Sequence, residues 1–208
     1  MAERSVVVTG VGRVLVVPDQ VELYLGVAHE SASPGEAFRE AAEASQRLLA
    51  LLEEAGLAPA DRRTTGVSVH PSFGRGSSEP VGHEAQVSIL ARCADLNTAG
   101  ALLDRLSRAL EGSLRVHGLA WVVADPAPAR AEASRAALAF ALARARDLAL
   151  GAELQLGQVR SIVEHPDVGV ARQRVARASA GFAQSAGPAM EPGSHEVLVA
   201  VEVEVELA

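Results

Sequence analysis

Residues 21–56, VELYLGVAHESASPGEAFREAAEASQRLLALLEEAG, join a strand pattern directly to a helix pattern. From Val21 to Val27 every second residue is apolar, which is the period of a half-buried strand. Ser33-Pro34-Gly35-Glu36 then has the form of a capping box, with Ser33 accepting from the backbone and Glu36 reaching back. Apolar residues at three- and four-residue spacing follow until Gly56. We therefore predict a strand over 21–30 and a helix over 34–55.

The same alternation continues toward the C-terminus. It predicts strands over 62–70, 82–93 and 114–124 and a helix over 95–111. The resulting order, βαββαβ, is ferredoxin-like and predicts an antiparallel sheet with two helices on one face. Four elements extend this unit: a strand over 6–17, an alanine-rich helix over 126–150, and strands over 156–163 and 197–207. The sequence thus predicts an α+β fold that forms one domain over residues 1–208.

Two segments lack a strand or helix pattern. Residues 71–82, PSFGRGSSEPVG, are rich in turn-forming residues and predict a mobile hairpin tip. Residues 166–193 form a connection that is long for a compact domain, so it is expected to carry a function or to be disordered. One alternative for function is therefore a small-molecule or enzymatic pocket under these two loops.

Glycines and alanines mark places of close packing. Gly10 and Gly12 suggest a dinucleotide-binding loop, but the third glycine is replaced by Leu15 and a strand pattern follows where a helix is needed. Glycines inside a strand more often mark a bulge or a close backbone approach. The helix over 126–150 holds eleven alanines, which give a thin apolar face suited to close packing.

Composition excludes several classes of function. The net charge is −7 and the cations are scattered, so nucleic acid is not an expected partner. All 19 cations are arginine, which excludes a Schiff-base lysine and a phosphate-loop lysine. The single cysteine excludes an internal disulfide framework. No apolar run approaches the ~20 residues that a membrane-spanning helix needs.

No catalytic, cofactor-binding or metal-binding residues are predicted. The six histidines never occur at the short spacings that place two ligands on one face, although separate strands could still converge. No Gly-x-Ser-x-Gly motif is present. Cys93 has two interpretations: a redox-active thiol whose pKa Arg92 lowers, or a small buried hydrophobic residue.

The last strand pattern has the plainest alternation. Valines face one way from Val197 onward, and Glu202, Glu204 and Glu206 face the other. The glutamates are interpreted either as a solvated or edge-protecting row, or as an ion ladder between subunits. The ladder's partners would be Arg172, Arg174 and Arg177, a run that could also bind an anion. The strand itself would offer an edge for pairing between subunits.

A set of short motifs, in order, extends over nearly the whole chain. They are Val8-Thr9-Gly10-Val11-Gly12-Arg13-Val14, Val17-Pro18-Asp19-Gln20-Val21, Ala94-Asp95-Leu96, Val116-His117-Gly118-Leu119, Asp125-Pro126, Leu156-Gly157-Gln158-Val159 and Pro192-Gly193. In this order they resemble SIMPL-domain proteins. The resemblance implies an α+β fold, homo-oligomers that are ring- or channel-like in some members, and no agreed catalytic residues. It also implies envelope relatives linked to oxidative-stress defence, and a vertebrate relative that acts as a signalling partner.

These observations favour a non-enzymatic, self-associating protein in oxidative-stress defence or cell-envelope maintenance. The pocket under loops 71–82 and 166–193 and a protein-interaction adaptor are the alternatives. Because no apolar targeting segment precedes Val6, a cytoplasmic location is expected for the sequence as written. A periplasmic or envelope location is expected if a leader has been removed.

Overall fold

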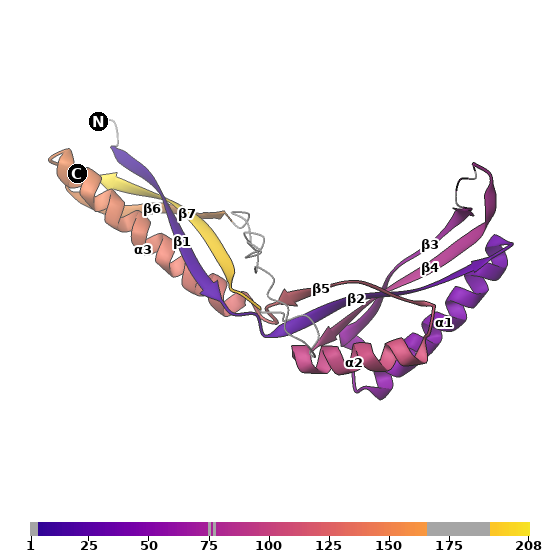
Figure 1. Ribbon diagram of the computed structural model, residues 1–208. Helices are drawn as coiled ribbons and strands as arrows, with labels where there is room; N and C mark the ends of the chain where they lie inside the picture. Colours follow the sequence, from indigo (N-terminus) through magenta and orange to yellow (C-terminus); the bar gives the residue numbers. More distant parts are fainter. Residues whose placement is uncertain (1–3, 75, 77, 166–191) are drawn as a thin grey trace. The chain divides into compact units, whose positions relative to one another are not determined.

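The computed structural model describes residues 4–74, 76, 78–165 and 192–208. The chain forms two compact units, one of residues 19–122 and one that combines residues up to 18 with those from 123 onward (Figure 1). Each unit has its own sheet and its own buried core. The prediction of a single domain over 1–208 stays a prediction, and the two units are described separately below.

The unit of residues 19–122 has the predicted βαββαβ order. Its elements are β2 (Gln20–Ser31), α1 (Pro34–Glu54), β3 (Arg62–Phe73), β4 (Pro80–Cys93), α2 (Leu96–Ala109) and β5 (Leu114–Val122), with a short 3-10 turn at Pro59–Asp61. The strands lie in the order β3-β4-β2-β5, and all neighbours are antiparallel. Both helices cover the same face of this sheet (Figure 1). The ferredoxin-like arrangement is thus confirmed, with strand ends within a few residues of those predicted.

The core of this unit follows from the alternation in the sequence. The inward residues of β2, from Val21 to Val27, are fully buried against Leu48 and Leu52 of α1 and Leu106 of α2. At the start of α1 the Ser33 hydroxyl accepts from the backbone N–H of Glu36 at 3.3 Å, as predicted. The Glu36 carboxylate, however, accepts from the Ser31 hydroxyl at 3.1 Å. The predicted capping box is therefore present in its first half, and Ser31 is the partner that Glu36 reaches.

The β3–β4 turn is shorter than predicted. The ladder continues through Pro71 paired with His83 to Phe73 paired with Pro80. Residues 71–73 and 80–82, predicted as part of the tip, are therefore strand. Pro71 is tolerated because β3 is an edge strand, where a missing backbone donor costs little.

The second unit has a three-stranded sheet with one helix. Its elements are β1 (Ser5–Val16), α3 (Ala127–Gly151), β6 (Leu156–His165) and β7 (His195–Leu207). The order is β1-β7-β6, antiparallel throughout, and α3 runs along β1 and β7 (Figure 1). The prediction that the terminal strand offers a free edge is wrong, because β7 is paired on both sides. Its strongly alternating valines are explained by this central place over the helix.

Close packing of α3 on β1 explains the glycines and alanines. A Cβ on Gly10 would lie 2.0 Å from the carbonyl oxygen of Ala137, and one on Gly12 would lie 1.8 Å from that of Ala133. The buried residues of α3 are alanines at four-residue spacing, Ala133, Ala137, Ala141, Ala145 and Ala149. Helix backbone and strand backbone therefore touch directly. The close approach predicted for the two glycines is confirmed, and α3 is the element that approaches.

Candidate functional site

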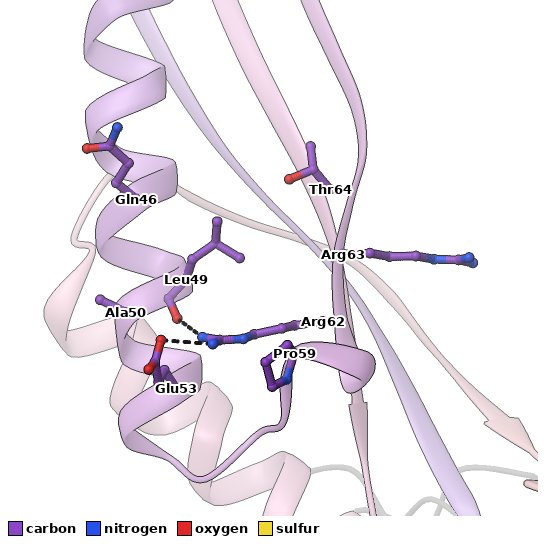
Figure 2. Close-up of a pocket in the computed structure, with 8 residues that line it drawn as sticks. All are labelled: Gln46, Leu49, Ala50, Glu53, Pro59, Arg62, Arg63 and Thr64. Atoms are coloured by element: carbon purple, nitrogen blue, oxygen red, sulfur yellow. Dashed lines mark hydrogen bonds and ion pairs between the residues drawn. The ribbon is translucent and has the colours of Figure 1, made fainter.

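A groove runs between the flank of α1 and strand β3 (Figure 2). Its volume is about 540 Å³, and its lining residues are Gln46, Leu49, Ala50, Glu53, Pro59, Arg62, Arg63 and Thr64. Arg62 crosses the groove, and its guanidinium donates to the Leu49 carbonyl at 2.7 Å and to the Glu53 carboxylate at 2.8 Å. In Figure 2 the Arg63 side chain points away from the groove, as its neighbouring strand position requires.

Arg62 anchors the end of α1. Its side chain is 13% exposed, and the last turn of the helix has no basic residue of its own. A cation placed there complements the negative end of the helix dipole. Because the guanidinium is already held by Leu49 and Glu53, this end of the groove is a structural contact. It does not present a free cation to a ligand.

A second cavity, of about 340 Å³, lies between the end of α1 and α2. It is lined by Leu57, Leu102 and Arg105 among others, and Arg105 is ion-paired with Glu54. Neither cavity is lined by residues 71–82. Nearly all of the connection 166–193 lies outside the described residues. The pocket under these two loops therefore stays a prediction.

The outer face of the four-stranded sheet carries a polar row. Arg92 donates to Glu22 at 2.7 Å, and the Tyr24 hydroxyl donates to the same carboxylate at 3.2 Å. Burial, followed by the hydrogen bond to Glu22, raises the pKa of Tyr24. The hydrogen bond to Glu22 also raises the pKa of Arg92. Tyr24 thus remains a neutral donor and Arg92 remains a cation, and both donate hydrogen bonds to Glu22.

His117 lies over Gly26 on the same sheet. Its Nε2 is 3.0 Å from the Gln86 amide nitrogen, and a Cβ on Gly26 would lie 2.8 Å from that Nε2. Gly26 therefore makes room for the ring. The imidazole has an amide as its partner, which orients the ring but forms no base–nucleophile pair. The contact between His117 and Gln86 is not predictable from the sequence, because only the cross-strand register brings the two side chains together.

Cys93 ends β4 with its side chain 2% exposed. Burial, followed by the charges of Asp95 and Asp61, raises the pKa of the thiol. A raised pKa disfavours the reactive thiolate. This environment favours the small buried hydrophobic residue over the redox thiol, and Arg92, predicted to lower the pKa, is instead turned toward Glu22.

In the part of the chain that the structure describes, three histidines each have one buried ring nitrogen without a hydrogen-bond partner. They are His29, His83 and His195, through Nε2, Nδ1 and Nε2 respectively. Within residues 4–74, 76, 78–165 and 192–208, no three histidine, cysteine or acidic side chains are grouped closely enough to hold a metal ion.

The outer face of the β1-β7-β6 sheet, opposite α3, combines acidic and apolar side chains. Glu202 and Glu204 are half-buried in its middle strand, and Glu206 is ion-paired with Arg160 of β6 at 3.0 Å. On β1 the side chains of Val7, Val11 and Leu15 are 57%, 50% and 67% exposed. The predicted ladder partners Arg172, Arg174 and Arg177 lie outside the described residues, so the ladder stays a prediction.

The sequence matches one family model over residues 6–205, described as SIMPL, a protein of unknown function (DUF541). The chain belongs to the SIMPL family. The match confirms the resemblance that the short motifs indicated, and it extends over nearly the whole chain. None of the described helices in this SIMPL chain has the length and apolar character needed to cross a membrane.

Two similar proteins share a printed description. The 26 kDa periplasmic immunogenic proteins of Brucella melitensis biotype 1 and of Brucella abortus strain S19 are each 29% identical to the SIMPL chain over 166 residues. The match covers 76% of the chain and 66% of the relatives' length. Among solved structures, an amidase of the hydantoinase/carbamoylase family from Burkholderia multivorans is 19% identical. The matched region covers 62% of this chain and 33% of the amidase chain. The TM-score is 0.27, which is too low to indicate a shared fold.

Proposed function

We propose that this chain is a non-enzymatic protein of the cell envelope that acts by self-association, in a stress-defence role. The observation that carries the self-association is the outer face of the β1-β7-β6 sheet, where Val7, Val11 and Leu15 are each at least half exposed. A face that exposes several large apolar side chains together is typical of an interaction surface. The names of the Brucella relatives support the envelope location, and the resemblance to the family supports the stress-defence setting.

The register across the three strands supports a second copy as the partner of this face. Thr9, Glu202 and Val163 lie side by side across the sheet, and Val7, Glu204 and Ser161 form the next row. Glu202 and Glu204 therefore share one face at two-residue spacing, and each has a valine on one side and a hydroxyl residue on the other. Two adjacent carboxylates repel each other, and a cation supplied from outside relieves that repulsion.

Arginine is the cation that the chain can supply. It has 19 arginines and no lysine, and a guanidinium binds a carboxylate through two parallel hydrogen bonds. We propose that arginines of a second copy, Arg172, Arg174 and Arg177 first, bind Glu202 and Glu204. Val7, Val11 and Leu15 supply the apolar surface buried around these ion pairs.

The experiment measures native mass by light scattering after size exclusion at micromolar concentration. We expect the wild-type chain to run well above its own 21.5 kDa. The double variant Glu202→Gln/Glu204→Gln should shift toward 21.5 kDa, because it removes both carboxylates while keeping side-chain size. The control, Glu43→Gln/Glu111→Gln, removes two exposed charges elsewhere and should keep the wild-type mass. A wild-type chain that stays at 21.5 kDa would remove the proposal.

A further inference from the structure

Strand β3 is an edge of the four-stranded sheet, and Pro71 protects only the end nearest the β3–β4 turn. Its register with β4 is irregular between Thr64 and Gly66 and again between Ser72 and Phe73. Between these points, Gly66–Ser72 is regular and carries no carboxylate or guanidinium. Edge strands are normally protected from pairing by charges, bulges or a covering element.

Two other edge strands that the structure describes have such protection. Strand β6 carries Arg160 and Glu164 and has two register shifts, and β5 has a shift in the middle of its pairing with β2. Within the four-stranded sheet, the Gly66–His70 stretch of β3 therefore combines a regular ladder with an uncharged sequence.

Exposed apolar side chains lie on the helix side of the same edge strand. Val67 and Val69 pair with the inward residues Val87 and Ala85, so they face the helix side of the sheet. They are nevertheless 54% and 37% exposed, because the core of α1 packs over β2 and β4. Phe38 of α1 is 48% exposed. It lies about three turns before Leu49 on the same flank of α1, the flank that faces β3 at Leu49.

We propose that β3 pairs antiparallel with β3 of a second copy, about a two-fold axis at Ser68. This inference rests on the self-association proposed above, but it assigns a different surface. In this register Val67 lies opposite Val69 of the second copy, and the same contact recurs on the other side of the axis. An isologous pairing of this kind closes on itself and joins the two sheets into one.

Charge favours this occupant and this direction. A chain with a net charge of −7 repels its own copies, and Arg62–Phe73 is a stretch without any carboxylate. Its two arginines, Arg62 and Arg63, stand at one end. Antiparallel pairing about Ser68 places the basic end of each strand beside the uncharged end of the other, so no like charges face each other.

The test is a disulfide cross-link on the axis. Ser68→Cys, in a Cys93→Ala background, places two introduced thiols directly opposite each other, at a Cα separation of about 4.5–5.5 Å that a disulfide spans. Ser107→Cys, an exposed position on α2 that lies in neither proposed surface, controls for random collision. We expect the Ser68→Cys chain to form a covalent dimer at least ten-fold faster than the control. Adding Val67→Arg should abolish this advantage without unfolding the chain, because that side chain is mainly exposed.

Equal rates for Ser68→Cys and Ser107→Cys would overturn the inference. The inference would also be overturned if Val67→Arg removed a native dimer while Ser68→Cys formed no cross-link. An element other than β3 of the second copy would then contact the surface around Val67. The two proposals fail separately. Loss of assembly in Glu202→Gln/Glu204→Gln concerns the outer face of the β1-β7-β6 sheet, whereas the cross-linking rate concerns β3 alone.

Discussion

At the scale of single residues, Gly12 controls how closely α3 packs on β1. The Cβ of a Gly12→Ala variant would lie 1.8 Å from the Ala133 carbonyl oxygen, and backbone atoms cannot rotate away as a side chain can. The helix must shift, and overpacking of this kind costs about 3 kcal/mol. We expect urea unfolding to show this loss in the transition of the unit that contains α3.

Gly100 provides the matched control. It is an exposed residue inside α2, and a Cβ added there meets nothing within 4 Å. Gly100→Ala should therefore stabilise the chain by about 0.5–1 kcal/mol, because alanine loses less backbone freedom in a helix. If both substitutions changed stability alike, the direct backbone contact of α3 with β1 would be wrong.

Residue patterns carried part of this information before the structure. Glycines in a valine-rich strand indicate a close backbone approach, and an alanine-rich helix indicates close packing. Both features were therefore predicted from the sequence. What the patterns lacked was the pairing, because Gly12 and Ala133 are far apart in the sequence. His117 and Gln86 were missed for the same reason, since the partners belong to different strands and meet only through the register with β2.

At the scale of elements, the end of α1 depends on an arginine from the next strand. Arg62→Met keeps the aliphatic stem but removes donors to the Leu49 carbonyl and the Glu53 carboxylate. Hydrogen bonds to charged groups contribute about 1.5–3 kcal/mol, so we expect a loss in that range by chemical denaturation.

Arg105→Met is the comparison for that variant. Arg105 forms an ion pair with the neighbouring Glu54, but both side chains are largely exposed. An exposed pair stabilises by under about 1 kcal/mol and weakens with added salt. Equal losses for the two variants, or a loss for Arg62→Met that disappears in salt, would show that the anchor on the Leu49 carbonyl contributes little.

Element boundaries were predictable where a local signal exists. Ser33 and Asp95 mark the starts of α1 and α2, and both side chains accept from the backbone as their positions require. The place of a strand in its sheet was not predictable. The alternation of β7 fits a half-buried strand at an edge or in the centre equally well, and its pairing with β1 joins the two ends of the chain.

At the scale of the whole molecule, the two buried cores share no residue. One core is formed within residues 19–122, and the other by β1, α3 and β7. Local patterns could not show this division, because the second unit is assembled from both ends of the chain. No composition change marks its boundaries near residues 18 and 123, so the sequence suggested one domain.

The unit of residues 19–122 is therefore expected to fold by itself. Its ends meet, since Gln20 pairs with Val122 and the Asp19 N–H donates to the Val122 carbonyl at 3.2 Å. A contiguous segment of about 100 residues with its own core is within the usual size of a domain. The isolated segment should show one cooperative thermal transition and native-like circular dichroism. Joining residue 18 to residue 123 through a short glycine–serine linker should leave the other unit folded as well. A segment without a cooperative transition would mean that the two cores depend on each other, and the chain would then behave as one domain.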